Sequence, residues 1–303
     1  MSAATTSAQI SGPNMSRRIS CFGYVSPSSL DEAVSALSEQ DGASPIAGGT
    51  DLLAMMKLRA ANPACLVNLK RIPGLDSICE EGGMLRIGAL VKIKTILASS
   101  VIEQRCRALH ESTLDFATPL IRNMATIGGN ICRSSPGADT IPPLLAYGAE
   151  LKLIGRGGER IVPLDDFFTG PGQNVLDGEV LTEIHLRLPE GPTGSAFAKL
   201  TRNSGDLAKV NCAVAIRMSD GRCEDVRIAL GAVADRPIRA RAAEEMLCGA
   251  TLDDRLIDAA ADKAREETAP ISDARSTARH RLRVTRVLVG RLLRIAVERA
   301  GQS

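Results

Sequence analysis

Two glycine pairs constrain this chain more than any other feature of its sequence. Gly48-Gly49 lies between Ala47 and Thr50, and Gly128-Gly129 lies between Ile127 and Asn130. Glycine takes positive φ at no steric cost and allows the backbone to approach a ligand, so such a turn can present successive N–H groups as an anion-binding nest. A helix that begins after the turn adds positive potential. One glycine pair is weak evidence, because most are simple turns, but two in one chain predict two loops that hold a pyrophosphate from two sides.

The sequence excludes the two common nucleotide-binding motifs. Neither glycine pair belongs to a G-x-G-x-x-G pattern, and the chain contains no G-x-x-x-x-G-K-[ST] pattern. A Rossmann dinucleotide site and a P-loop both require these spacings. A dinucleotide site in this chain must therefore belong to another fold.

Size and charge narrow the class of protein. The chain has 303 residues, which predicts roughly two domains. It has no Trp, two Tyr and five Phe, so an aliphatic core is expected. The 37 basic and 35 acidic residues nearly balance, which gives no electrostatic reason to expect a nucleic-acid partner. No segment has the roughly 20 consecutive apolar residues of a membrane span.

The cysteines and histidines do not suggest a metal site. None of the eight cysteines forms a C-x-x-C pair, and the three histidines lie far apart in the sequence. Zinc and iron–sulfur sites have characteristic spacings that are absent here, so no metal ligand is expected. Residues 1–15 are small and polar and lack the apolar segment of a secretory signal. We interpret them as a disordered leader and expect a reduced, cytoplasmic protein.

Periodicity and turn residues predict an α+β chain. Ser29 and Glu32 form a capping-box pattern before an apolar-faced helix. The composition of residues 189–194 is typical of a linker. Strands are expected just before the first glycine pair and at 65–70, 84–89, 208–218 and 223–233, with a hairpin over 150–164. One helix is expected after the first glycine pair and another after the strand at 84–89. Further helices are expected at 29–40, 101–113, 142–148, 240–247, 254–268 and 276–299.

Four segments resemble the flavoprotein subunits of molybdenum hydroxylases. PIAGGTDLLAMMK, at residues 45–57, resembles the first FAD loop of this family, and ATIGGNICRSSPGADTIPPLLAYGAEL, at 125–151, resembles the second. GEVLTEIHLRLP, at 178–189, and FAKLTRNSGDLAKVN, at 197–211, resemble segments beside the flavin. The family includes subunits of carbon monoxide dehydrogenase and nicotinate dehydrogenase and the central FAD domain of xanthine dehydrogenase. The four motifs occur in the family's order, and the resemblance covers nearly the whole chain.

This resemblance implies an FAD site with assigned positions. It implies that Asp139 lies by the ribose or ribityl hydroxyls and Phe116 near the adenine end. Leu181 would pack against the isoalloxazine, and Lys199 would lie near its carbonyl edge, where a cation favours the anionic reduced ring. The pyrophosphate would be held by Ala47, Gly48, Gly49, Thr50 and Asp51 of one loop and Thr126, Ile127, Gly128, Gly129 and Asn130 of the other.

Two of these positions also have ordinary structural interpretations. Asp139 could cap the helix expected from Pro142. Lys199 could be a solvated surface lysine, which is the usual environment of a lysine. The sequence leaves both alternatives open.

The chain departs from its relatives in two respects. Subunits of the carbon monoxide dehydrogenase type have a tyrosine where this chain has Leu207, in a loop with Asp206 that matches the flavin face. An aliphatic residue at this position is similar to the xanthine dehydrogenase domain. It would leave the face of the flavin ring less shielded. The benzoyl-CoA reductase branch has a four-cysteine insertion for an iron–sulfur cluster. This chain lacks it, so we expect flavin to be its only cofactor.

The fold implied by the resemblance is α+β. A two-lobed FAD-binding domain of the vanillyl-alcohol-oxidase and MurB type would span residues 16–189, with lobes at about 16–70 and 71–189. A small antiparallel sheet with helices would follow at 190–303.

The implied function is electron relay. The chain would be the FAD subunit of a complex with a small [2Fe-2S] subunit and a large molybdopterin subunit, assembled as a dimer of heterotrimers. No nucleophile with a paired base is recognisable in the chain, so no catalytic residue is assigned. One alternative is a stand-alone FAD-dependent oxidoreductase of the MurB or alcohol-oxidase type. Another is a binding module without enzymatic activity, in which the glycine loops are only turns.

Overall fold

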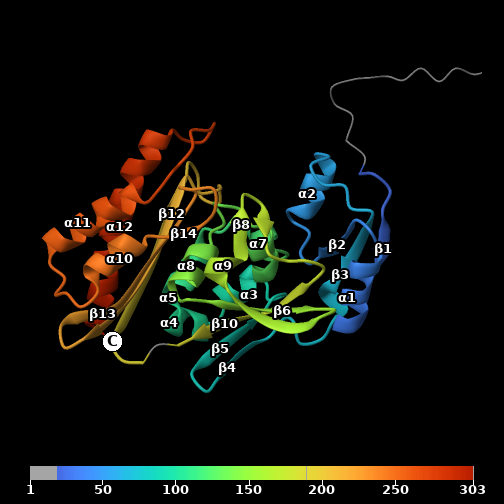
Figure 1. Cartoon of the computed structure of the whole chain (residues 1–303), viewed down its shortest axis with the longest axis horizontal. Helices are drawn as coiled ribbons and strands as arrows, with labels where there is room; N and C mark the ends of the chain where they lie inside the picture. The colour runs from blue at the N-terminus through green and yellow to red at the C-terminus, as the bar shows by residue number, and fades with distance from the viewer. Residues whose placement is uncertain (1–18, 189, 303) are drawn as a thin grey trace, which may run out of the picture.

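The computed structural model describes residues 19–188 and 190–302. The expected leader at residues 1–15 lies outside this range. The described chain forms three units in a row, each built around its own sheet, with the N-terminal unit at one end and the C-terminal unit at the other (Figure 1). None of the described helices is long and apolar enough to cross a membrane.

The N-terminal unit is a three-stranded parallel sheet in the order β1-β3-β2. All four residues of β3, the central strand, are buried. The Ser29 hydroxyl accepts a hydrogen bond from the Glu32 N–H at 3.2 Å, which confirms the predicted N-cap of α1. The elements are β1 (Gly23–Val25), α1 (Leu30–Glu39), β2 (Ala43–Ile46), α2 (Leu52–Lys57) and β3 (Cys65–Asn68).

The middle unit is a five-stranded antiparallel sheet in the order β4-β5-β10-β6-β7. The predicted hairpin over 150–164 is confirmed as β6 and β7, which pair from Glu150↔Pro163 to Gly155↔Gly158. The sequence pattern did not predict the central strand β10, because its alternation of apolar and polar residues is broken at Val180–Thr182, beside a register shift between Leu181 and Glu183. The strands are β4 (Ile78–Glu81), β5 (Met84–Gly88), β6 (Glu150–Gly155), β7 (Gly158–Pro163) and β10 (Val180–Arg187), with a small pair β8 (Phe168–Gly170) and β9 (Gln173–Asn174).

Short helices connect and cover this sheet. The single helix expected at 101–113 is instead two helices, because Cys106 leaves helical geometry with φ −134° and ψ 56°. Cys106 itself is buried. The helices are α3 (Ile93–Leu97), α4 (Ser100–Arg105), α5 (Arg107–Leu114), α6 (Pro119–Arg122), α7 (Ile127–Cys132), α8 (Ile141–Ala146) and α9 (Leu164–Phe167), and a 3-10 turn η1 (Leu69–Arg71) follows β3.

The C-terminal unit is an antiparallel sheet in the order β11-β12-β13-β14, covered by three helices. Strand β11 was missed because small residues dominate it. They are needed there, since a Cβ on Gly194 would overlap the carbonyl oxygen of Ala296 in α12. The elements are β11 (Thr193–Leu200), β12 (Val210–Ser219), β13 (Arg222–Gly231), β14 (Ile238–Arg239), α10 (Arg241–Leu247), α11 (Asp254–Glu266) and α12 (Ala278–Ala300).

The C-terminal sheet buries both of its faces. α12 packs on β11 and β12, and α8 of the middle unit packs on β12 and β13 from the other side. Ala213 and Ala229 therefore belong to the core of the middle unit, although their strands belong to the C-terminal sheet. This shared core fixes the loop between β11 and β12 against the middle unit.

Candidate functional site

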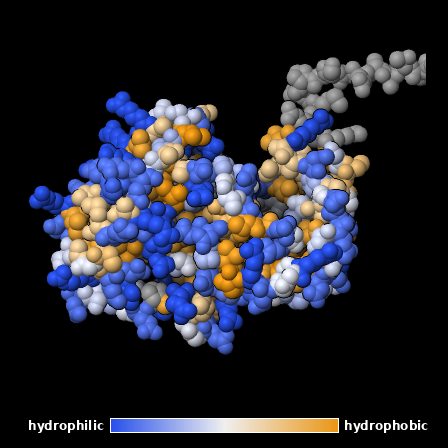
Figure 2. All heavy atoms as spheres, in the orientation of Figure 1, coloured by the Kyte–Doolittle hydropathy of each residue, from blue (hydrophilic) through white to orange (hydrophobic). Residues whose placement is uncertain are grey.

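A cavity of about 620 Å³ lies where the three units meet. Its lining comes from the turn after β2, from α7 and the loop after it, from the start of β10, and from the loop between β11 and β12. Figure 2 shows the surface hollowed between the N-terminal unit and the middle unit. This volume lies within the usual range for small-molecule and cofactor sites.

The first glycine turn has the properties of an anion-binding nest. Gly49 has φ of +70°, a conformation that glycine adopts without strain. The N–H groups from Gly48 to Asp51 have no hydrogen-bond acceptor among the described residues, and all four residues line the cavity. Gly48, Gly49 and Thr50 are half-buried and Asp51 is exposed, so their N–H groups are open to the cavity, and a row of such donors is suited to a bound anion.

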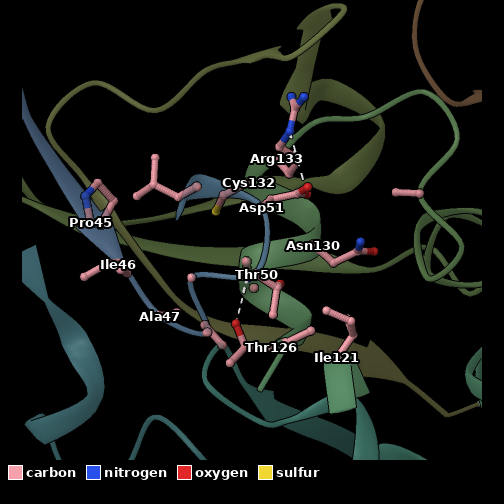
Figure 3. A pocket seen from close by; sticks show the side chains of 18 of the residues that line it. Pro45, Ile46, Ala47, Thr50, Asp51, Ile121, Thr126, Asn130, Cys132 and Arg133 are labelled. Atoms are coloured by element: carbon pink, nitrogen blue, oxygen red, sulfur yellow. Dashed lines mark hydrogen bonds and ion pairs between the residues drawn. The ribbon is translucent and has the colours of Figure 1, made fainter. Parts of the chain in front are cut away.

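Gly48 is required for a different reason from Gly49. A Cβ at this position would overlap the carbonyl oxygen of Met124 and lie 2.8 Å from its carbonyl carbon. The first turn is thus pressed against the backbone that leads into α7. Figure 3 shows the labelled residues of the first loop and of α7 around one space.

The second glycine pair is not the turn that the sequence predicted. Thr126 caps α7, and Gly128 and Gly129 lie inside the helix without positive φ. The Gly128 N–H donates to Ala89 O at 2.9 Å, and the Gly129 N–H donates to Thr126 Oγ1 at 3.1 Å. The prediction of a second nest is therefore wrong. Gly128 serves packing instead, since a Cβ would lie 2.7 Å from the Ala89 carbonyl oxygen.

Most of the predicted site residues line the cavity. Two do not line it: the side chain of Ile127 lies in the hydrophobic core, and Lys199 lies behind Asp139. The loop residues Asp206 and Leu207 also belong to the lining. The predicted residues that line the cavity are Ala47, Gly48, Gly49, Thr50, Asp51, Phe116, Thr126, Gly128, Gly129, Asn130, Asp139 and Leu181.

Lys199 is the centre of a buried polar cluster. Its ammonium donates to Asp139 Oδ2 at 2.8 Å and to the carbonyl oxygens of Asp115 at 2.9 Å and Asp206 at 3.2 Å. The side chains of Lys199 and Asp139 are only 5% and 7% exposed, so Lys199 is not a surface lysine. Three acceptors engage the three ammonium donors. Lys199 thereby holds together three segments that form one end of the cavity.

Asp139 is held in place from two sides. Its second carboxylate oxygen accepts from the Asn211 amide at 3.0 Å. Burial raises the pKa of Asp139, and the Lys199 ammonium opposes this shift. The structure does not support the capping alternative, because α8 has Thr140 at its N-cap position and no side-chain cap bond.

The contacts of Lys199 show whether the adenine and the isoalloxazine of FAD can lie where the resemblance implied. Asp115, next to Phe116, and Asp206, next to Leu207, both accept from Lys199. Phe116 and Leu207 are therefore at the same end of the cavity. An extended FAD cannot place its adenine and its isoalloxazine at one end, so at most one of the two predicted contacts can hold.

Several apolar residues that line the cavity were not predicted from the sequence. Leu52 and Met55, one turn apart on α2, both line it. Their i, i+3 spacing directly after the nest was the available signal. Nothing in the local sequence pointed to Arg133, which also lines the cavity. The other missed apolar residues here are Pro45, Ile46, Leu69, Leu90, Leu176 and Val180.

The arrangement fits a dinucleotide cofactor. A row of unpaired backbone N–H groups, apolar side chains and the hydrogen-bonded Asp139 all line one cavity. The sequence model described as FAD binding domain in molybdopterin dehydrogenase matches residues 20–189. The chain belongs to the FAD-binding medium subunits of molybdenum hydroxylases. The sequence model described as CO dehydrogenase flavoprotein C-terminal domain matches residues 195–296 of this medium subunit.

Individual relatives agree with the family assignment. The carbon monoxide dehydrogenase medium chain of Afipia carboxidovorans is 38% identical over 92% of this chain and 96% of its own length. The xanthine dehydrogenase FAD-binding subunit of Escherichia coli is 31% identical over 92% and 97%. The solved structure of carbon monoxide dehydrogenase from Hydrogenophaga pseudoflava superposes with a TM-score of 0.89 at 38% identity and covers 92% and 98% of the two chains. The chain is thus an oxidoreductase subunit with an FAD-binding domain, and the α+β fold is confirmed.

We expect this medium subunit to hold FAD without a covalent bond. The described residues that line the cavity include no histidine, and their one thiol, Cys132, has a pKa raised to about 12 by burial. A thiol that stays protonated is a poor nucleophile toward the flavin ring. Denaturing the purified protein should release FAD into the supernatant, where chromatography identifies it. Flavin that stays on the polypeptide, or FMN in the supernatant, would contradict this expectation.

Proposed function

We propose that this medium subunit is an electron relay. FAD, when bound, supplies two-electron and one-electron redox chemistry, so the chain can receive electrons from [2Fe-2S] clusters on a small partner subunit and deliver them to an external acceptor. Oxidation of the organic substrate would take place on a large molybdopterin subunit. The supporting observation is that the described residues lining the cavity include no histidine, lysine or tyrosine, and that Asp139 and Glu179 are held in close ion pairs.

Two of the four carboxylates that line the cavity are held in close ion pairs. Asp139 pairs with Lys199 at 2.8 Å and Glu179 with Arg160 at 2.7 Å. A stand-alone oxidoreductase needs a base or acid within hydrogen-bond reach of its substrate. These pairings favour the relay over the MurB or alcohol-oxidase alternative. The two remaining carboxylates, Asp51 and Asp206, lie 3.7 Å from Arg133 and 3.8 Å from Arg202.

In this proposal the chain's own residues bind and orient the cofactor. The N–H groups from Gly48 to Asp51 would hold the pyrophosphate, and Leu181, only 4% exposed, would pack against the ring. Leu207 is 58% exposed at the rim of the cavity, which would leave that edge accessible for electron transfer. The Lys199 cluster would fix the loops that carry Phe116 and Leu207. We propose residues 16–70 and 71–189 as the two FAD-binding lobes and 190–303 as the C-terminal domain.

The relatives are named as medium chains or FAD-binding subunits, which supports the proposal of a smaller and a larger partner subunit. We propose one small and one large partner subunit and a dimer of such heterotrimers in the cytoplasm. NAD, a quinone, a cytochrome and oxygen are the candidate acceptors.

Stopped-flow reduction of the flavin tests the relay. The organic substrate of the complex is expected to bleach the flavin rapidly in the assembled complex and not in the isolated medium subunit, because the isolated chain would lack the molybdenum and iron–sulfur chemistry. Dithionite reduction of the isolated chain is the control that its flavin is redox-active. Rapid bleaching of the isolated chain by the substrate would overturn the relay and support the stand-alone oxidoreductase.

A further inference from the structure

Arg133 is the single cationic side chain among the described residues that line the cavity. It follows α7 directly, and its side chain lies beside Asp51 at the end of the nest (Figure 3). Its guanidinium group donates no hydrogen bond to any described residue, although it has five N–H donors. Its nearest charged partner is Asp51, with Nε 3.7 Å from Oδ2, and both side chains are partly exposed.

A pyrophosphate bound in this cavity would need a positive charge to balance its own. The pyrophosphate of FAD carries two negative charges, and the nest offers it only neutral N–H dipoles. Lys199 and Arg160 are engaged with Asp139 and Glu179 and do not line the cavity. The Asp51 carboxylate, whose own N–H belongs to the nest, would repel a phosphate bound there. Arg133 is the positive charge beside Asp51, where it would also contact a phosphate bound to the nest.

We propose that Arg133 binds the FAD phosphates, exchanging the weak ion pair with Asp51 for a forked contact to phosphate oxygens. A planar guanidinium suits this contact because two parallel N–H donors match two phosphate oxygens. The exchange is favoured because the ion pair with Asp51 is long and partly exposed, and such pairs contribute little. The inference rests on FAD binding by this chain and is independent of the electron route.

Replacing Arg133 with glutamine is expected to weaken FAD binding about 10- to 100-fold, the usual effect of losing hydrogen bonds to a charged group. The dissociation constant is measured by titrating the deflavinated full-length protein with FAD and following flavin fluorescence. Binding to the variant should also depend less on ionic strength, because one screened attraction is gone. Arg133→Lys should recover part of the affinity, since lysine keeps the positive charge but lacks the two parallel N–H donors of the guanidinium. The control is Arg156→Gln, which removes an exposed arginine paired with Glu39.

Asp51→Asn separates this proposal from a purely structural role of the ion pair. If the Arg133–Asp51 pair is a clasp across the cavity, breaking it from either side should weaken FAD binding. If Arg133 binds phosphate, removal of the competing carboxylate should leave FAD binding as tight as in the wild type or tighter. We expect the second result.

Three outcomes would overturn the proposal. They are an unchanged FAD affinity in Arg133→Gln, an equal loss of affinity in Arg133→Gln and Asp51→Asn, and a loss of affinity without a change in its salt dependence. Should Arg133→Gln fold poorly, Arg133→Lys and Asp51→Asn still decide the question. A wild-type protein that did not bind FAD would refute the cofactor assignment itself, which this titration shows separately.

Discussion

Gly48→Val is expected to remove FAD from the purified protein. The new side chain would overlap the backbone of Met124, which cannot rotate away as a flexible side chain could. The first turn must then move off the backbone before α7, and the row of N–H groups moves with it. A hydrogen bond to a charged group contributes about 1.5–3 kcal/mol, so loss of two or more of these N–H contacts should lower the FAD affinity at least about 100-fold.

The ratio of flavin to protein absorbance after purification gives the result. Gly49→Val should show the same loss for another reason, since a β-branched residue is strained at φ +70°. Gly157→Val is the matched control, because no atom lies within 4 Å of a Cβ there and its φ is not positive. Normal flavin content in Gly48→Val, at unchanged thermal stability, would show that the first turn does not hold the pyrophosphate.

Lys199→Met is expected to destabilise the fold by about 3–5 kcal/mol, the usual cost of leaving one partner of a buried ion pair alone. Asp139 would keep its Asn211 contact but lose its counter-charge, and the carbonyl oxygens of Asp115 and Asp206 would lose their shared donor. Urea unfolding of the wild type and the variant measures the difference. The double variant Lys199→Met with Asp139→Asn should recover part of the stability, because no buried charge remains. A loss below about 1 kcal/mol, the range of exposed ion pairs, would contradict a buried cluster.

The stability of Lys199→Met should also depend on pH in a defined direction. Burial raises the pKa of Asp139, and the variant lacks the cation that opposes this shift. A carboxyl group whose pKa is higher in the folded state binds more protons when folded, so its contribution to stability is complete below its unfolded pKa. That contribution is lost as the pH rises through the folded pKa. The difference from the wild type should therefore shrink on acidification, and a difference that grows on acidification would refute this account.

The sequence by itself determined the features that depend on neighbouring residues. The N-cap at Ser29, the hairpin turn at 156–157 and the positive φ at Gly49 follow from local geometry and local hydrogen bonds. The order of four motifs, each a property of a short segment, was enough for the family.

The tertiary structure alone decided what the other residues do. Gly128 and Gly129 resemble the first pair in sequence, yet Thr126 and Ala89 satisfy their N–H groups within and beside a helix. Lys199 pairs with Asp139, which lies sixty residues away in the sequence. Neither the burial of Lys199 nor its partners could therefore be deduced from its sequence neighbours. An isolated segment fixes its own backbone preferences, but whether a donor is free or a charge is paired depends on which distant backbone and side-chain atoms the packed sheets bring within hydrogen-bond distance.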